Sequence, residues 1–217
     1  MRQDLQLTAV SGSAKLRLAA HSPSPTHTPR RSCVKIVFAR HCQTDWNVQI
    51  RVQGQSDRPL NEHGTNQAKS LAVSLAGLGI TRILTSDLLR AVQTAMIIAD
   101  SLQVPVQTDE RLRECSFGQL EGLTRVEILK SFDQDIHLPP PNSYDFQAYG
   151  GETWHEVLNR QLEALEEHGP KSDDDLPLVI GHGRSLSTLL FHLDHHSSIY
   201  QGEFTVVPYR PLVRRRP

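Results

Sequence analysis

Two arginines and two histidines are the residues of this chain whose types and positions suggest chemistry on an anion. Arg40 and His41 follow one mostly apolar run, and His182 follows another. Arg90 stands near the start of a predicted helix. A guanidinium matches phosphate oxygens bidentately and keeps its charge at neutral pH, and a histidine ring nitrogen can act as a nucleophile. Brought to one point, the four side chains would bind a dianion.

Three short apolar runs, rich in β-branched residues, are predicted to be the buried strands that carry these side chains. They span residues 34–39, 81–86 and 176–181. Runs of this length and composition are typical of parallel strands covered on both faces. The first run ends at the Arg-His pair and the third at the second histidine, while the second arginine lies in the first helical turn after the second run. Such sheets bind ligands beyond the carboxyl ends of their strands.

Helical segments alternate with these strands. One helix is predicted to have Asn61 as its N-cap and to end before Gly79, and a second covers residues 87–102 with Ser86 or Asp87 as its cap. The buried face of the first helix is expected to consist of Ala68, Leu71, Ala72, Leu75 and Leu78. Strands alternating with helices indicate a sheet covered on both faces. The predicted fold class is α/β: a single three-layer α/β/α domain with a mostly parallel central sheet.

Four further segments complete the predicted domain. Residues 104–108 are expected to form an edge strand, because Pro105 cannot donate a ladder hydrogen bond. Residues 122–132 and the segment that begins at Trp154 are predicted to be helices. The stretch 137–151, rich in proline and glycine, is expected to be an ordered but irregular loop that shapes a pocket.

The first 33 residues differ from the rest of the chain. They hold a single acid, Asp4, and are rich in Ser, Thr and Pro. Too little apolar surface is present to offset the entropy lost on ordering, so residues 1–33 are predicted to be a disordered tail. The same composition occurs in organelle transit peptides, an alternative that ranks below a plain tail. The domain is expected to span residues 34–217.

Composition excludes several function classes. The 217 residues include 23 basic and 24 acidic ones, for a formal net charge of -1. No strong global field therefore draws the chain to nucleic acid or to an anionic membrane. The apolar runs are too short to cross a bilayer. Three cysteines, an odd number in a chain of this size, favour free thiols and a reducing compartment. We expect a soluble, cytoplasmic protein; the sequence is silent on its oligomeric state.

Six blocks of the chain, in this order, resemble the phosphoglycerate mutase-like branch of the histidine phosphatase superfamily. The resemblance runs from about Val34 to Leu190, whereas the segment beyond about residue 200 matches poorly. The blocks read ARHCQTDWN, RVQGQSDRPLNEHG, SDLLRAVQTA, ERLRECSFGQLEG, YGGETWHEVLNR and VIGHGRSL.

The resemblance implies a role for each matching residue. His41 corresponds to the nucleophile that takes the phosphoryl group. Arg40, Arg90 and His182 correspond to the groups that bind the phosphate, and His182 is counted with the catalytic set. Glu114 corresponds to the general acid, which protonates the leaving oxygen and then, as a base, activates water.

Further contacts are expected around the phosphate. Asn47 and Thr44 resemble lesser contacts of the family. Backbone N–H groups at the starts of the helices near Asp87 and Gly183 are expected to add donors. No metal or cofactor is needed for this chemistry. The partner is predicted to be a small phosphorylated metabolite.

The chemistry sets conditions on two of these residues. A nucleophilic His41 must be neutral, with its other ring N–H held by an acceptor such as a carbonyl. Two fixed cations nearby would favour the neutral imidazole. Glu114 must hold a proton to act as an acid, so burial or the charge of the phosphate is expected to raise its pKa.

Cys42 stands where the family has glycine. Cysteine-based phosphatases use a His-Cys pair and an arginine at a position that is occupied here by Val48; Arg51 comes three residues too late. His41 is therefore the predicted nucleophile. Glycine in the family could serve a positive φ, in which case Cys42 would weaken activity. A thiol beside two arginines is also expected to have thiolate character and to be sensitive to oxidation.

The function predicted from these residues is a metal-independent phosphatase that hydrolyses small phosphomonoesters through a phosphohistidine. The acid block RLRECSFG resembles the phosphatase branch, and the chain from Glu114 to Glu152 is short for a mutase. Alternatives are a phosphoglycerate mutase and a pseudoenzyme that binds phospho-ligands. His192, His195 and His196 could suggest a metal site, but a complete ligand set is not evident.

Overall fold

A computed structural model describes residues 34–132, 139–196 and 198–210 of the chain. The tail predicted for residues 1–33 lies outside the described residues. Most of the segment predicted to be an irregular loop, from residue 139 onward, lies within them. No helix among the described residues is long and apolar enough to span a membrane.

Five strands form one sheet in the order β3-β2-β4-β1-β5. Their bounds are Val34–Arg40 for β1, Arg82–Thr85 for β2, Val106–Thr108 for β3, Pro177–Gly181 for β4 and Phe204–Tyr209 for β5. Three of the four pairings are parallel, and β5 pairs antiparallel with β1. The mostly parallel α/β sheet is thus confirmed, and β3 is the edge strand that Pro105 predicts.

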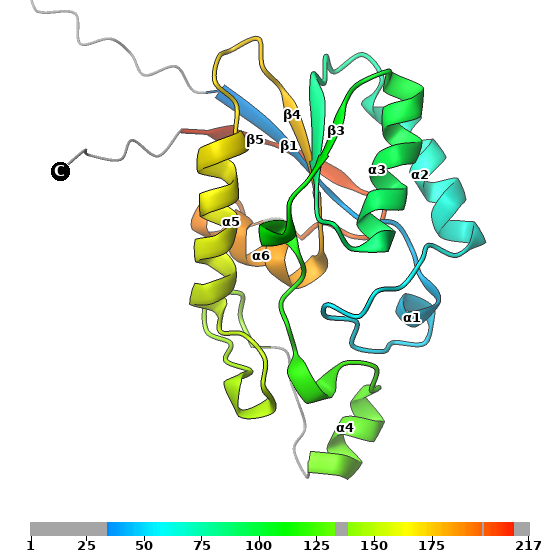
Figure 1. Ribbon diagram of the computed structural model, residues 1–217, viewed down its shortest axis with the longest axis vertical. Helices are drawn as coiled ribbons and strands as arrows, with labels where there is room; N and C mark the ends of the chain where they lie inside the picture. Colours follow the sequence, from blue (N-terminus) through cyan, green and yellow to red (C-terminus); the bar gives the residue numbers. More distant parts are fainter. Residues whose placement is uncertain (1–33, 133–138, 197, 211–217) are drawn as a thin grey trace, which may run out of the picture. The chain divides into compact units, whose positions relative to one another are not determined.

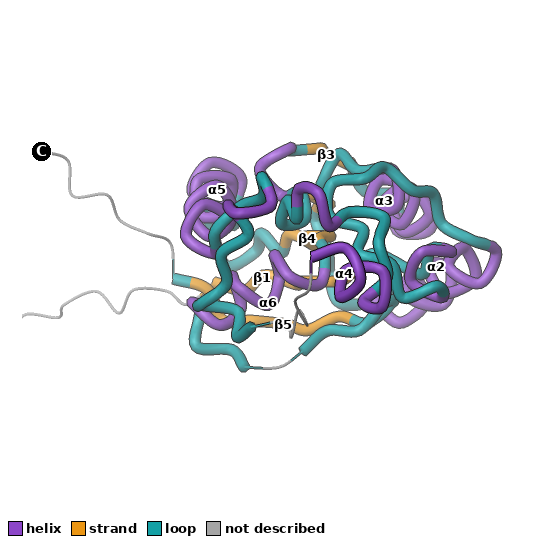
Figure 2. The backbone as a smooth tube through the Cα atoms, turned by 90° about the horizontal axis from the view of Figure 1, so that it is seen from below, coloured by secondary structure: helices purple, strands orange, loops and turns teal. Residues whose placement is uncertain are grey.

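Six α-helices of the described residues surround the sheet. They are α1 (Asp45–Val48), α2 (Glu62–Leu75), α3 (Leu89–Leu102), α4 (Arg125–Phe132), α5 (Trp154–His168) and α6 (Gly183–His192). Figure 1 shows α2 and α3 on one side of the sheet and α5 on the other, and the view from below in Figure 2 agrees. Short 3₁₀ turns cover Glu110–Leu112, Gly118–Leu120 and Gln147–Tyr149. The predicted three layers are therefore present.

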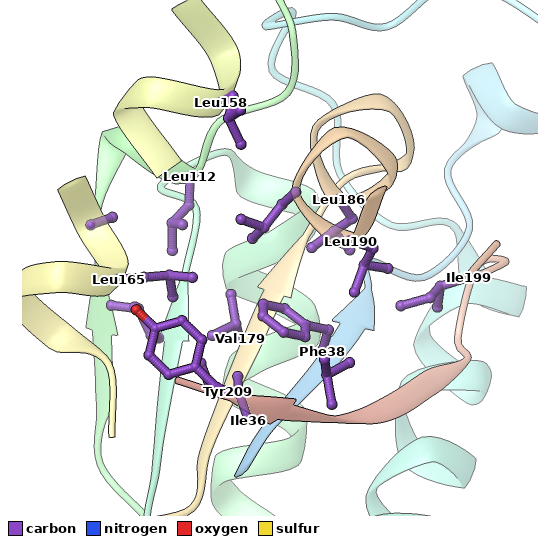
Figure 3. Close-up of a cluster of buried hydrophobic side chains, with 14 of the residues drawn as sticks. Ile36, Phe38, Leu112, Leu158, Leu165, Val179, Leu186, Leu190, Ile199 and Tyr209 are labelled. Atoms are coloured by element: carbon purple, nitrogen blue, oxygen red, sulfur yellow. The ribbon is translucent and has the colours of Figure 1, made fainter. Parts of the chain in front are cut away.

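Two apolar clusters pack the faces of the sheet. On one side, Phe38 and Val179 of the strands meet Leu165 of α5 and Leu190 of α6 (Figure 3). On the other side, the strands meet the buried face of α2 and α3. Alternate residues of a strand point to opposite faces, so β1 and β4 supply both clusters. These two central strands are the rigid base on which the site stands.

The boundaries of three predicted helices need correction. The helix predicted for residues 122–132 starts at Arg125. Asn61 is the N-cap of α2, as predicted, but α2 ends at Leu75 because Ala76 leaves the helical region with ψ 133. Leu78 lies beyond the helix and is 39% exposed, so it is not part of the buried face. The start of α3 lies at Leu89, two residues later than predicted.

The cap of α3 comes from a distant segment. Leu88 occupies the N-cap position but makes no side-chain cap hydrogen bond. The N–H of Leu89 instead donates to Asp57 Oδ1 at 2.6 Å. Ser86 binds only the N–H of Leu88, before the helix starts. A cap supplied by a residue 32 positions away leaves no local sequence signal.

The chain end that matched poorly has a definite place. β5 forms a ladder with β1 from Val34↔Tyr209 to Ala39↔Phe204. Tyr209 and Val207 are buried in the cluster under α5 and α6. The segment beyond residue 200 therefore belongs to the domain up to Arg210, the last residue described.

A third apolar cluster supports the predicted irregular loop. Tyr144 and Phe146 of the loop pack with Cys115, Phe117 and Ile128. Tyr144 is fully buried, and its hydroxyl shares a hydrogen bond with Thr188 of α6. The loop is irregular but anchored, as expected, and it joins α4 to the rest of the domain.

Gly64 allows α2 to approach the segment that follows His41, and replacing it tests this contact. A Cβ at Gly64 would lie 2.0 Å from the backbone oxygen of Gln43. Alanine is the better helix former by about 1 kcal/mol, yet we expect Gly64→Ala to lower the free energy of unfolding by about 2 kcal/mol, because backbone must move. Chemical denaturation measures the change. Asn66→Ala, at an exposed site of α2, is the control and should not destabilise.

Candidate active site

The register of β1 and β4 brings the two predicted histidines together. The last ladder pair is Arg40↔Gly181, so the next residues of both strands, His41 and His182, lie side by side. The N–H of His41 continues the ladder by donating to the oxygen of Gly181 at 3.0 Å. The two ring centroids are 5.1 Å apart. Sheet geometry alone therefore pairs two residues that are 141 positions apart in the sequence.

The ring of His41 is held in one orientation. Its Nδ1 lies 2.7 Å from the backbone oxygen of Cys42, so Nδ1 carries the proton and donates it to that carbonyl. Nε2 is then the deprotonated nitrogen. The acceptor is of the kind predicted for a nucleophilic histidine, and His41 is only 2% exposed.

Two guanidinium groups accompany the histidines. Arg90 is fully buried and donates to the backbone oxygens of Gly54 and Ser56 at 2.7 and 2.9 Å. The Nε atoms of Arg40 and Arg90 and both ring nitrogens of His182 are buried without a hydrogen-bond partner among the described residues. Each unsatisfied buried polar group costs about 1–3 kcal/mol. This clustering of unused donors is typical of an anion-binding site.

The surroundings keep both imidazoles neutral. Burial lowers the pKa of His41 and His182 well below 6.5, and the nearby charges of Arg90 and Arg40 lower it further. Desolvation, more than the two cations stressed in the prediction, is the main cause. Burial also lowers the pKa of Arg90 to about 10, which still leaves the guanidinium charged at neutral pH.

The carboxyl group of Glu114 lies beside the N-terminal end of α6. Its Oε1 accepts from the N–H groups of Cys115 at 2.9 Å and Ser185 at 2.8 Å, and its Oε2 accepts from the N–H of Arg184 at 3.0 Å. Three N–H donors fix the plane of the carboxyl group. Oε2 receives only one of them and has the more room for a proton. That Glu114 carries a proton when phosphate is bound stays a prediction.

These contacts correct the expected use of the helix starts. At α6, the N–H groups of Arg184 and Ser185 bind Glu114 and are not available to a phosphate. At α3, the first N–H binds Asp57. Gly183 lines the pocket, and the use of its own N–H by a phosphate stays a prediction. A Cβ at this position would lie 2.9 Å from Arg40 Cζ. Glycine lets the Arg40 guanidinium lie against the backbone.

Asn47 and Thr44 form the cap of α1. Thr44 N–H donates to Asn47 Oδ1 at 3.0 Å, and Asn47 N–H donates to Thr44 Oγ1 at 3.2 Å. The carbonyl side of the Asn47 amide is thereby occupied, which leaves Nδ2 as its donor. Asn47 lines the pocket, whereas Thr44 is fully buried behind it. Asn47 is therefore better placed than Thr44 to contact a phosphate directly.

A pocket of about 740 Å³ joins these groups. Six of the predicted site residues line it: Arg40, His41, Asn47, Arg90, Glu114 and Gly183. His182 is fully buried beside His41. We call Arg40, His41, Arg90 and His182 the floor of the pocket. The remaining lining is mixed. Its apolar or aromatic members include Trp46, Ile50, Val52, Phe117, Phe191, Ile199 and Tyr200, and its polar members include Arg51, Gln53, Arg184, Ser187, His195 and His196.

Comparison with known proteins decides the family. The model of the histidine phosphatase superfamily (branch 1) matches residues 36–203. This chain belongs to that superfamily. The resemblance drawn from the six blocks is thus confirmed. The matched range also extends beyond the last block, VIGHGRSL, to residue 203.

Relatives of this histidine phosphatase carry different names. A Serratia proteamaculans protein called probable phosphoglycerate mutase GpmB is 35% identical over 157 residues, which are 72% of this chain and 73% of that protein. Bacillus stearothermophilus YhfR superposes with a TM-score of 0.70 at 32% identity, over 80% of this chain and 90% of that one. A mycobacterial glucosyl-3-phosphoglycerate phosphatase, solved with VO₃, gives 0.70 at 28% over 80% and 92%.

The predicted behaviour of Cys42 is wrong. Its thiol is fully buried, and burial raises its pKa to about 11, so it has no thiolate character at neutral pH. Cys42 is also not among the described non-glycine residues with positive φ, so it needs no glycine-like backbone. Its side chain packs in the cluster with α2 and α3 and lies close to Gly202. The predicted sensitivity of the Cys42 thiol to oxidation therefore has no support in its surroundings.

Sequence reasoning missed two residues that position the site. Arg160 of α5 donates to the backbone oxygens of Arg111, Arg113 and Glu114 at 2.6–2.9 Å, which fixes the segment that carries Glu114. Glu121 accepts from the N–H groups of Gln55 and Ser56, both at 3.0 Å. That carboxylate holds the turn whose oxygens bind Arg90. Both lie in the matched blocks, GQLEG and WHEVLNR, which were the available signal.

Two described histidines between residues 192 and 196 have contacts of their own. Among the residues that the structure describes, no group of three His, Cys, Asp or Glu side chains is placed to hold a metal ion. His195 instead shares a hydrogen bond with Thr205 at 3.1 Å, and the ring of His196 contacts Phe191.

The buried neutral histidines predict how stability depends on pH. Below pH 6.5 the unfolded chain binds protons at His41 and His182 that the native protein does not bind. Lowering the pH therefore decreases the free energy of unfolding, by about 1.4 kcal/mol per pH unit for each histidine. We expect the decline between pH 6.5 and 5 to be shallower in His182→Asn than in the parent. Urea unfolding at several pH values measures it.

His63→Asn, at an exposed position of α2, serves as the matched control and should keep the slope of the parent. Equal slopes in the parent and in His182→Asn would show that His182 is not neutral in the native site.

Proposed function

We propose that this histidine phosphatase hydrolyses phosphomonoesters without a metal, through a phosphoryl group carried on His41. One observation carries the proposal: the floor holds an imidazole with Nδ1–H fixed by a carbonyl, beside two guanidinium groups whose buried Nε atoms have no partner among the described residues. A free Nε2 is the nucleophile, and the guanidinium groups bind the oxygens that gain charge in the transition state.

The reaction proceeds in two transfers. Nε2 of His41 attacks phosphorus, the bond from phosphorus to the ester oxygen breaks, and Glu114 gives its proton to the departing alcohol. The Glu114 carboxylate then takes a proton from water, whose oxygen attacks the phosphohistidine and releases phosphate. Arg40, Arg90 and neutral His182 hold the three equatorial oxygens in both transfers. Glu114 thus ends the cycle protonated, as it began.

Phosphoglycerate mutase activity is the second candidate. It is favoured by the names of the bacterial relatives and by Arg184, a pocket residue with no carboxylate partner among the described residues. A mutase must hold intermediates that carry two phosphates, and Arg184 could bind the second. Its Nη1, however, already donates to Pro139 O at 2.6 Å, and its guanidinium packs over Tyr144. These contacts leave the Arg184 guanidinium less available to a second phosphate, which supports hydrolysis.

Hydrolysis of p-nitrophenyl phosphate in the presence of a chelator tests the proposal. We expect turnover by the parent and a loss of roughly 10³-fold or more in His41→Ala, because the nucleophile is gone. Cys42→Ala should keep the activity, since the buried thiol does not reach the pocket. The phosphoenzyme trapped by rapid quenching should be labile to acid and stable to base, as expected for phosphohistidine.

Two results would contradict this reading. Full activity in His41→Ala with none in Cys42→Ala would move the phosphoenzyme to sulfur. Isomerisation of 3-phosphoglycerate that outpaces release of phosphate, and that fails in Arg184→Ala, would make the protein a mutase. Arg51→Ala is the matched control for Arg184→Ala, because the charge of Arg51 is already paired with Glu127.

A further inference from the structure

Ile50 has an unusual backbone for its residue type. It follows the C-cap of α1, Gln49, and adopts a left-handed conformation with φ 55. Glycine or asparagine is the usual residue at this position after a helix, because a side chain branched at Cβ clashes with the backbone there. A β-branched residue with positive φ is a true outlier. Such outliers gather at functional sites.

Packing does not explain the choice of isoleucine. The residue is 78% exposed, the highest value among the exposed large apolar residues of the described chain. Its N–H donates to Asn47 O at 3.2 Å, a contact that any residue except proline would make. The side chain therefore adds strain and exposes apolar surface without a matching gain in the fold.

The location of Ile50 supplies a reason. It lines the same pocket as the floor residues. Other apolar members of that lining are also open to solvent: Tyr200 is 65% exposed and Phe191 is 37% exposed. Because the floor is buried, these exposed side chains mark the mouth of the pocket. A phosphate bound at the floor would leave its organic group among them.

Two cations on the segment that follows Ile50 are already occupied. Arg51, the next residue, pairs with Glu127 at 2.7 Å and donates to the oxygen of Gly122. The guanidinium of Arg58 packs over the ring of Trp46 at 4.0 Å. Neither is free to bind a second anion beside Ile50; the other polar members of the lining include Gln53, Arg184 and His196.

We propose that Ile50 is a specificity-determining residue that contacts an apolar organic group, aryl or alkyl, of the phosphomonoester substrate. The inference rests on the proposed function in that it takes the floor as the phosphate site. It goes further in naming the class of substrate: an ester whose alcohol carries an apolar group that packs against Ile50.

Binding of phenylphosphonate and methylphosphonate, measured by calorimetry, tests the proposal without requiring turnover. The parent should bind phenylphosphonate the more tightly. Ile50→Asn should weaken phenylphosphonate by about tenfold, since apolar contact is lost, and leave methylphosphonate within about twofold. The same variant should unfold about 2–4 °C higher, because asparagine tolerates the left-handed conformation. A gain in stability together with a loss of selectivity is not expected of a structural residue.

Gln103 provides the matched control. It also ends a helix in a left-handed conformation, with φ 55, but it lies at the end of α3 and outside the pocket lining. Gln103→Asn should leave the preference for phenylphosphonate unchanged. Ile50→Gly, which also removes the strain, should reproduce the loss of preference seen in Ile50→Asn.

An unchanged ratio of the two affinities in both Ile50 variants would overturn the proposal, whatever their stability. The failure of the proposed function has a different signature. If the parent prefers phenylphosphonate and hydrolyses no ester, phosphatase activity is ruled out while the role of Ile50 stands. If the parent binds neither phosphonate, both ideas fail.

Discussion

The burial of the Arg90 charge without an ion pair to any described carboxylate is the constraint on which the site depends. Arg90 is fully buried, and its two terminal nitrogens are held by backbone oxygens of residues 54 and 56 instead of by an acid. Carbonyl dipoles stabilise the guanidinium without cancelling its charge. The uncancelled charge then acts on its neighbours, where it adds to desolvation in keeping both histidines neutral. The same arrangement that binds a phosphate thus also prepares the nucleophile.

Backbone groups do most of the positioning around this charge. The ladder between β1 and β4 places the histidines, a carbonyl fixes the His41 ring, and N–H groups at the start of α6 fix Glu114. The side chains of Arg160 and Glu121 act one step further out. Arg160 holds the segment that carries Glu114, and Glu121 holds the turn whose backbone oxygens bind Arg90. A site built in this way keeps its geometry as long as the sheet and two loops keep theirs.

This division explains what the sequence could reveal. Short apolar runs indicate buried strands, so the sheet and the order of strands and helices along the chain were predictable. The same runs predicted that Arg40, His41, Arg90 and His182 converge. The position of the Cys42 thiol was not predictable in this way, because a residue next to His41 in the sequence need not lie in the same site. Successive residues point in opposite directions, so the thiol enters the apolar cluster while His41 enters the pocket. The cap of α3 by Asp57 was equally hidden, since it joins segments 32 residues apart.

The floor and the mouth of the pocket obey different physical rules, and this separates reaction from substrate. The floor lies on the ends of β1 and β4 and on the first turn of α3, and it needs buried charge, so its residue types are tightly restricted. The mouth comes from helix ends and loops, where an exposed residue such as Ile50 can even be strained without endangering the core.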